Sequence, residues 1–200
     1  MRLAILVGSK GRGSNMKAIL SACRSGHIYA KGALVIAPLQ DLPAVASAIE
    51  LGAEVAILNP EDPHFGEELL AILAAEKIDL LCLAGYMRLL PKKVVKALEN
   101  RILNIHPALL PKYGGKGMYG PRLHEAVIAS GDKESGCTVH YVNENYDEGD
   151  ILLQLKCKVK EGDTPETLAE RVLALEHEAY VNAIRQWLRE QRYAGRNASL

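Results

Sequence analysis

The stretch Ile102-Leu103-Asn104-Ile105-His106-Pro107 decides how this chain folds. Its apolar residues predict a buried strand, and Pro107, which lacks a backbone N–H, ends the hydrogen-bond ladder of that strand. Residues two apart on a strand point to the same face, so Asn104 and His106 should emerge together near the strand's carboxyl end. Ligands bind at that edge of an open parallel sheet. We therefore expect these two side chains to hold one small group together.

Similar apolar runs alternate with helical patterns on both sides of this stretch. The expected strands are residues 3–7, 33–36, 55–58, 80–84 and 102–105. Alternating strands and helices imply right-handed crossovers and a sheet that helices cover on both faces. The sequence therefore predicts an α/β fold, with an open, mostly parallel, twisted sheet of the Rossmann-like kind.

The alternation changes in the C-terminal third. After a short helix between Leu123 and Ser130, two strands follow in succession at residues 138–142 and 151–159. The polar loop 143–150 joins them, reverses the chain and should carry Asp147 to the site. We therefore expect antiparallel strands to be added to the parallel sheet.

A helix start follows at Thr164-Pro165-Glu166, with a hydroxyl cap, proline in the first turn and an acid near the positive end of the helix dipole. This last helix should run to about Glu190. Residues 1–192 are expected to form a single domain. The small and polar residues 193–200 should form a flexible tail.

Composition and charge limit the class of protein. The 200 residues are 48% hydrophobic, enough for one sizeable core, and 24 basic residues balance 24 acidic ones. A net charge of zero gives no general attraction for nucleic acid or a membrane surface. The apolar run at residues 3–7 is too short for a signal peptide or a membrane span. We expect a cytoplasmic protein.

The cysteines and histidines show no metal-binding pattern. Cys23, Cys82, Cys137 and Cys157 contain no Cys-x-x-Cys pair, and three of them stand in apolar runs. They are interpreted as buried thiols without a disulfide. No histidine pair has the spacing of metal ligands, so no metal is expected. His27, His64 and His124 are expected at the surface.

A glycine-rich loop, Gly8-Ser9-Lys10-Gly11-Arg12-Gly13-Ser14-Asn15, lies between the first expected strand and a helix. Glycines let backbone amides turn toward an anion, and the helix amino terminus adds partial positive charge. The loop lacks the Lys-Ser/Thr of an ATP-binding P-loop and the third glycine of a dinucleotide fingerprint. It favours a phosphate monoester. A strand-to-helix turn without a ligand is the alternative.

Five segments together resemble the phosphoribosylglycinamide formyltransferase family, folate-dependent enzymes of purine synthesis. They are residues 11–15, 84–90, 104–111 and 136–140 and the motif Asp147-x-Gly149. They stand in the family's order and spacing, and the resemblance extends from Met1 to about Trp187. It implies the formyltransferase fold.

The resemblance also implies two substrates and the residues that bind them. Glycinamide ribonucleotide would place its phosphate on Gly13, Ser14 and Asn15 and its amino end at Glu176. The formyl donor, 10-formyltetrahydrofolate, would lie against Met87, Arg88, Leu89 and Leu90 and against Val142, Asn143, Glu144, Asn145 and Tyr146. By pattern alone, Glu176 and Arg88 fit exposed ionic residues, and Leu89 and Leu90 fit a core.

Three polar residues carry the chemistry that this resemblance implies. The substrate amine would attack the formyl carbon and produce formylglycinamide ribonucleotide by way of a tetrahedral oxyanion. Asn104 is suited to donate a hydrogen bond to that oxygen. His106 and Asp147 would stabilise charge and move protons, in a division of roles that the sequence leaves open. A direct role for the nearby His140 is left open too.

Other functions are compatible with the same three residues. A 10-formyltetrahydrofolate hydrolase, a formyltransferase for another amine and a noncatalytic phosphate or folate sensor are the alternatives. The partners are expected to be small molecules, with the protein a monomer or a homodimer. Residues 37–40, 62–64 and 114–120 depart from the family pattern. The last of these segments is interpreted as a flap over the pocket.

Overall fold

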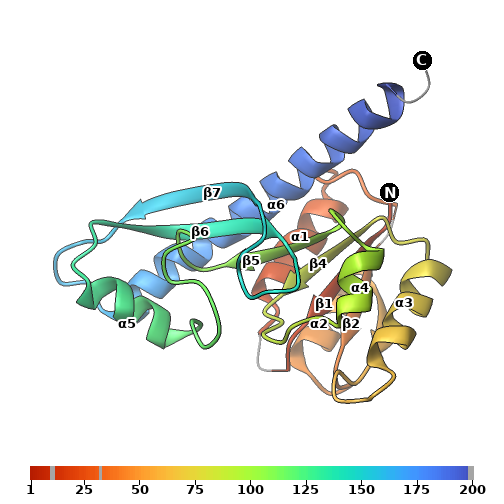
Figure 1. Cartoon of the computed structure of the whole chain (residues 1–200), viewed down its shortest axis with the longest axis horizontal. Coiled ribbons are helices and arrows are strands. Elements are labelled where there is room, and N and C mark those ends of the chain that lie inside the picture. The colour runs from red at the N-terminus through yellow and green to blue at the C-terminus, as the bar shows by residue number, and fades with distance from the viewer. Residues whose placement is uncertain (10–11, 32, 198–200) are drawn as a thin grey trace.

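The computed structural model describes residues 1–9, 12–31 and 33–197, and in these residues seven strands form one mixed sheet. In spatial order the strands are β3 (Glu54–Ile57), β2 (Ala33–Ala37), β1 (Leu3–Val7), β4 (Leu80–Ala84), β5 (Ile102–His106), β6 (Glu134–Tyr141) and β7 (Ile151–Lys158). The pairs from β3 to β5 are parallel, and the pairs β5–β6 and β6–β7 are antiparallel (Figure 1). The predicted fold class is confirmed.

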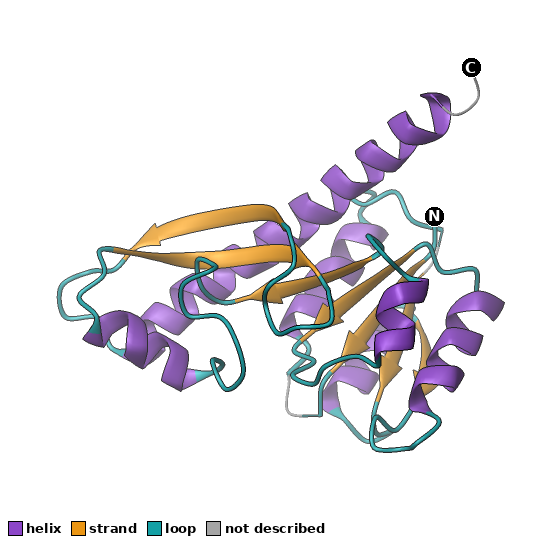
Figure 2. Ribbon diagram, viewed as in Figure 1, coloured by secondary structure: helices purple, strands orange, loops and turns teal. Residues whose placement is uncertain are grey.

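Helices cover both faces of the sheet (Figure 2). They are α1 (Ser14–Arg24), α2 (Pro43–Glu50), α3 (Phe65–Ala75), α4 (Lys92–Ala97), α5 (Pro121–Ala129) and α6 (Pro165–Asn197). Residues of α1, α2, α5 and α6 belong to one hydrophobic core, and residues of α3 and α4 belong to a second core. A continuous apolar strand between two such layers contributes to both, as expected for a covered parallel sheet.

The central strands show how this apolar pattern is used. In β1, Leu3, Ile5 and Val7 pack in the core under α1 and α6. The alternate residues Ala4 and Leu6 pack in the core under α3 and α4. Successive side chains of a strand point to opposite faces, so a short apolar run fills both layers.

Strand β5 ends directly before Pro107, as the sequence predicted, and one residue beyond the expected range 102–105. Its last residue is His106, and Pro107 follows directly. Leu103 and Ile105 pack in the core under α6, so Asn104 and His106 share the opposite face. The expectation that these two side chains emerge together is confirmed.

The first antiparallel strand, β6, begins four residues earlier than the sequence indicated. This strand starts at Glu134, whereas the apolar pattern placed its start at Thr138. Glu134, Ser135 and Gly136 pair with residues of β7, so backbone pairing extends the strand through a polar segment. Because these residues are not apolar, the hydrophobic pattern of the sequence could not indicate their pairing with β7.

Helix α6 begins as predicted but is longer. The Thr164 hydroxyl accepts a hydrogen bond from the backbone N–H of Thr167, at 3.3 Å, and Pro165 is the first helical residue. The expected end near Glu190 is wrong, because the helix continues to Asn197 beyond the sheet (Figure 1). The expected tail is therefore helical through residue 197, and residues 198–200 lie outside the described part of the chain.

One buried group connects α6 to the sheet near the carboxyl ends of its parallel strands. The Tyr180 hydroxyl lies 2.9 Å from the carbonyl oxygens of Leu83 and Leu103, which belong to β4 and β5. One hydroxyl hydrogen is shared between these two acceptors. Because Glu176 lies one turn earlier on the same helix, this contact helps to place Glu176 over the carboxyl ends of the strands.

Within the described residues, no helix is both long enough and apolar enough to cross a membrane. All four cysteines have free thiols; Cys82 and Cys137 are buried, and Cys23 and Cys157 are partly buried. The expected surface position of His124 is wrong, because its side chain is buried on α5. This helix packs against α6, so its histidine faces inward.

Candidate active site

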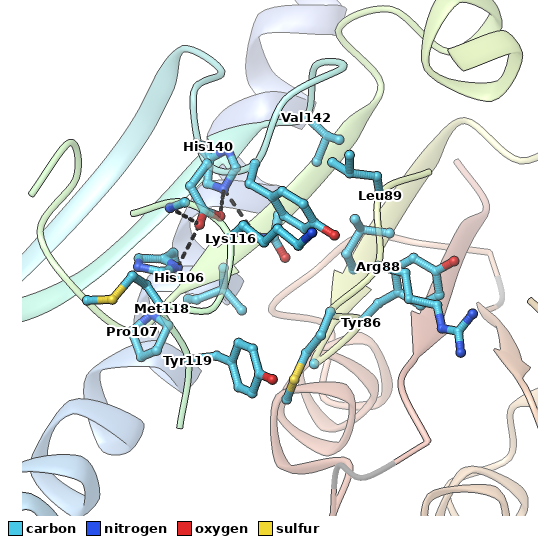
Figure 3. Close-up of a pocket in the computed structure, with 18 of the residues that line it drawn as sticks. Tyr86, Arg88, Leu89, His106, Pro107, Lys116, Met118, Tyr119, His140 and Val142 are labelled. Carbon is cyan, nitrogen blue, oxygen red and sulfur yellow. Dashed lines mark hydrogen bonds and ion pairs between the residues drawn. The ribbon is translucent and has the colours of Figure 1, made fainter. Parts of the chain in front are cut away.

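A cavity of about 400 Å³ lies at the carboxyl ends of β1, β4 and β5, within the size range of small-molecule sites. The start of α1 and Glu176 of α6 form part of its wall, and the segment after β4 forms another part. The remaining walls come from the end of β5, residues 115–120, His140 and the loop after β6. Segments far apart in the sequence therefore meet in one cavity (Figure 3).

Asp147 joins the two histidines of this cavity. Its Oδ2 lies 3.4 Å from Nδ1 of His106, and its Oδ1 lies 3.6 Å from Nε2 of His140. The backbone N–H of Gly115 donates a hydrogen bond of 3.0 Å to the same carboxylate. The predicted chain reversal therefore brings Asp147 to the end of β5.

The spacing Asp147-x-Gly149 has a steric cause. A Cβ atom on Gly149 would lie only 1.7 Å from the carbonyl oxygen of Tyr141, so only glycine allows this close approach. Asp147 itself has a φ of 58°, in the left-handed region that asparagine and aspartate tolerate better than other side chains. The loop thus turns tightly enough to direct the carboxylate back into the cavity.

The contacts of His106 define its protonation pattern. Its Nε2 lies 2.8 Å from the carbonyl oxygen of Tyr113, which only accepts hydrogen bonds, so Nε2 carries a proton. Burial lowers the pKa of His106 below its ordinary value of 6.5, although the Asp147 charge and the Tyr113 carbonyl oppose this effect. The ring is therefore neutral at pH 7, with its lone pair on Nδ1. The 3.4 Å to Asp147 fits this state, since charge-assisted hydrogen bonds measure about 2.7–2.9 Å.

The charge of Asp147 is maintained by its neighbours. Burial raises the pKa of this carboxyl, but the neighbouring imidazoles in their protonated state and the Gly115 N–H outweigh burial. The net result is a pKa below the ordinary value of 3.8. The site therefore presents a carboxylate beside a neutral imidazole at pH 7.

Asn104 is oriented by His140 on the neighbouring strand. Nδ1 of His140 lies 2.9 Å from the carbonyl oxygen of Tyr141 and therefore carries the proton. The unprotonated Nε2 accepts a hydrogen bond of 3.1 Å from Nδ2 of Asn104. Since an amide nitrogen has two hydrogens, one remains for a ligand. His140, whose role the sequence left open, is part of the site.

The predicted phosphate loop lies beside this cluster. Gly13, with a φ of 71°, immediately precedes α1, and Ser14 and Asn15 form the first turn. Asn15 lines the cavity, whereas Lys10 and Gly11 lie outside the described residues. The segment after β1 approaches the segment after β4 so closely that a Cβ on Gly8 would lie 2.0 Å from the Gly85 carbonyl oxygen.

Glu176 is a buried carboxyl group that faces this loop. It is only 9% exposed, and its Oε2 accepts a hydrogen bond of 2.6 Å from Nδ2 of Asn15. Burial raises the pKa of Glu176 above its ordinary value, although the Asn15 hydrogen bond lowers it in part. The alternative of an ordinary exposed helix acid is therefore wrong. The Oδ1 atom of Asn15 is buried without a hydrogen-bond partner and remains available to a ligand.

An apolar wall follows β4, where the sequence placed the folate site. Met87 and Leu89 remain 46% and 44% exposed at the cavity, so they are not core residues, whereas Leu90 is buried. Arg88 lines the cavity with its guanidinium 2.6 Å from the carboxylate of Glu61. Exposed apolar side chains at a cavity are suited to a flat ring system.

The loop after β6 is divided between this cavity and a neighbouring one. Val142, Asn145 and Tyr146 line the cavity that contains the catalytic candidates. Asn143 and Glu144 line the adjacent cavity instead, and Lys92 forms an ion pair of 2.8 Å with Glu144. The structure therefore brings only part of the predicted folate loop into direct reach of the cluster.

Residues 115–120, which belong to the expected flap, form one wall of the cavity, and the movement of this flap stays a prediction. Lys116, Met118 and Tyr119 line the cavity, and in Figure 3 Lys116 and Tyr119 project toward the wall that carries Leu89. Among the described side chains, Lys116 has no carboxylate within ion-pair distance. The glycine-rich composition of the segment is the sequence feature that could have indicated its place at the cavity. No cluster of three or more potential metal ligands occurs in the described part of the chain.

Comparisons with known proteins agree on one family. The profile of the family described as Formyl transferase matches residues 1–184. The chloroplastic phosphoribosylglycinamide formyltransferase of Arabidopsis thaliana is 42% identical over 188 residues, which cover 92% of this chain and 64% of that protein. The phosphoribosylglycinamide formyltransferase of Haemophilus influenzae is 36% identical over 199 residues, with 96% and 88% covered.

Solved structures give the same result. The crystal structure of glycinamide ribonucleotide transformylase 1 from Symbiobacterium toebii has a TM-score of 0.83 and 40% identity, and the match covers 92% of this chain and 86% of that one. The chain spans less than two thirds of the length of the plant relatives, with 64% of the Arabidopsis thaliana protein and 59% of the Vigna unguiculata protein covered.

Proposed function

The chain belongs to the formyl transferase family, and on that premise we propose that it transfers the formyl group of 10-formyltetrahydrofolate to the amine of glycinamide ribonucleotide. The product would be formylglycinamide ribonucleotide, in purine biosynthesis. One observation carries this proposal: Asn104, His106 and Asp147 lie in one cavity. The buried carboxyl of Glu176 lines the same cavity, as does the apolar wall that contains Met87 and Leu89. Relatives that bear the name of this activity support it.

The two ends of the cavity suit the two substrates. Gly13, Ser14 and Asn15 present the start of α1, which is suited to a phosphate, and Glu176 is suited to the ribonucleotide end beside it. The folate ring would pack on Met87 and Leu89. The additional residues that would bind the donor in this cavity are Arg88, Leu90, Val142, Asn145 and Tyr146, whereas Asn143 and Glu144 line the adjacent cavity. The reacting atoms would then meet at the end of β5.

Formyl transfer begins with attack of the amine nitrogen on the formyl carbon, and negative charge develops on the formyl oxygen. The free N–H of Asn104 donates to that oxygen, because its other N–H is bound to His140. A donor that is already oriented needs no rearrangement when the charge develops. This contact lowers the barrier more than a mobile amide would.

Proton transfer completes the reaction. The attacking nitrogen loses a proton, and N10 of the departing tetrahydrofolate gains one. The neutral His106 accepts the first proton at Nδ1, and the imidazolium so formed is stabilised by the Asp147 carboxylate 3.4 Å away. Collapse of the tetrahedral intermediate breaks the bond from carbon to N10, and return of the proton to N10 restores the site.

The test is formyl transfer by the purified protein supplied with both substrates. We expect release of tetrahydrofolate to depend on glycinamide ribonucleotide and to match the formylated product mole for mole. Release without the acceptor would instead indicate a hydrolase, and transfer only to another amine would indicate a different acceptor. Binding of both ligands without turnover would indicate a sensor. The cytoplasmic location, the single domain and the monomeric or dimeric state stay predictions.

A further inference from the structure

Tyr113, the residue before the glycine-rich wall, is fixed by its side chain. Its hydroxyl donates a hydrogen bond of 2.7 Å to Oδ2 of Asp132 and lies 2.5 Å from the Ser130 hydroxyl. Lys112 binds the same Asp132 carboxylate, with its ammonium 5.0 Å from the centre of the Tyr113 ring. The turn between α5 and β6, which contains Asp132, therefore holds the phenol.

The backbone of Tyr113 faces the opposite way, toward the catalytic cluster. Its carbonyl oxygen accepts the hydrogen bond from Nε2 of His106, at 2.8 Å. Tyr113 has a φ of 61°, which is unfavourable for a residue with a side chain, and two glycines follow it. A strained residue next to flexible ones keeps its conformation only when other contacts hold it.

We propose that Tyr113 and Asp132 are positioning residues for His106, acting through the backbone carbonyl of Tyr113. The phenol and the carboxylate hold the residue in its left-handed conformation, and the carbonyl then fixes the proton of His106 on Nε2. Nδ1 is left as the basic nitrogen, facing Asp147. Neither Tyr113 nor Asp132 touches the reacting atoms.

The same segment also contacts the other catalytic group. The N–H of Gly115 donates to Asp147, so the backbone between residues 113 and 115 contacts both partners of the proton-transfer pair. Loosening this backbone would change the tautomer of His106 and the distance from His106 to Asp147 together. We therefore expect kcat to fall while KM changes little. This kinetic consequence rests on the proposed function, but the tautomer does not.

The first measurement is the ¹⁵N spectrum of histidine-labelled protein at neutral pH, with His106→Gln used to assign the His106 signals. The wild type should show the neutral Nε2–H tautomer at His106. Tyr113→Phe keeps the ring and removes the hydroxyl, and Asp132→Ala removes its acceptor at an exposed turn. Both variants should show a mixture of the two tautomers. A pure Nδ1–H tautomer in the wild type, or unchanged spectra in both variants, would overturn the proposal.

The kinetic measurement compares these variants with a matched control. Lys156→Met removes another exposed ion pair, with Glu134, far from Tyr113 in the sequence, and should leave kcat unchanged. We expect Tyr113→Phe and Asp132→Ala to lower kcat about tenfold with KM within about twofold. The double variant should be no slower than the slower single variant, since both changes remove the same contact. Independent, multiplying losses would contradict the proposed route, and a wild type without turnover would count against the proposed function alone.

Discussion

Asn104 and His140 face each other across β5 and β6, with Nδ2 of the amide 3.1 Å from Nε2 of the imidazole. Because the other nitrogen of His140 donates to a backbone carbonyl, its Nε2 has only a lone pair to offer. The contact therefore selects one of the two orientations of the Asn104 amide. The orientation selected keeps an N–H available to the cavity.

Replacing His140 should reduce catalysis through Asn104. His140→Phe removes the acceptor, so the amide can rotate and present its oxygen to the developing oxyanion. We expect kcat to fall roughly tenfold to a hundredfold with little change in either KM. Steady-state kinetics with each substrate varied in turn would measure this. His140→Gln, which can offer an acceptor oxygen, should recover part of the loss, and equal rates in Phe and Gln variants would argue against the orienting role.

The lowered pKa of His106 predicts how stability depends on pH. Burial keeps the folded-state pKa below the ordinary 6.5, so between these two values the unfolded chain binds a proton that the folded chain does not. Stability should therefore fall as the pH falls through 6.5 and level off below the folded-state pKa. Chemical denaturation from pH 7.5 to pH 5 should show a smaller fall in His106→Gln. An identical fall would contradict the neutral, buried imidazole.

Glu176 should contribute to acceptor binding at a cost in stability. Its buried carboxyl has a raised pKa, so stability falls as the pH rises through the ordinary carboxyl range and stays lower above the folded-state pKa. Glu176→Gln removes that charge and should raise Tm at pH 7.5. The same change should raise KM for the ribonucleotide roughly tenfold or more, since a hydrogen bond to a charged group contributes about 1.5–3 kcal/mol.

Binding of the folate donor should be insensitive to Glu176→Gln. KM for the folate donor should stay within about twofold, because the donor is assigned to the other end of the cavity. A rise in KM for the donor alone would reverse that assignment. A lower Tm of Glu176→Gln at pH 7.5 would contradict the prediction. It would show that contacts of the carboxylate offset the cost of burying its charge.

Gly149 should be required for placing Asp147. Gly149→Ala would put a methyl group 1.7 Å from the Tyr141 carbonyl oxygen, so the loop must shift and carry the carboxylate away from His106. We expect kcat to fall by about a hundredfold, as a shift of about 1 Å can cause. A crystal structure of the variant would show the displacement. Full activity would mean that the loop absorbs the methyl group without moving Asp147.

The sequence predicted the parts of the site that depend on local pattern. Alternation along β5 placed Asn104 and His106 on one face, and the proline after them marked the end of the strand. The polar loop before β7 gave the chain reversal that delivers Asp147. Both conclusions depend on local features, namely the alternation of side chains along a strand and the polar composition of a turn. Residues close together in the sequence determine these features.

The remaining parts depend on contacts that pattern does not contain. The pairing of His140 with Asn104 needs the register between β5 and β6, which no single segment specifies. The position of the wall that contains Lys116 and Tyr119 depends on the backbone path after Tyr113, which has a positive φ. Hydrophobic pattern does not specify that path. His124 was misplaced because the inward face of a short helix depends on where α6 packs.

We propose that Asn104, His106 and Asp147 act on the formyl group after both substrates have bound. Single-turnover transfer from 10-formyltetrahydrofolate to glycinamide ribonucleotide, at saturating enzyme, tests this claim most directly. We predict that Asp147→Asn and His106→Ala slow the transfer step by about a hundredfold or more while both ligands still bind with Kd within about threefold of the wild type. Transfer at the wild-type rate in either variant would contradict the account.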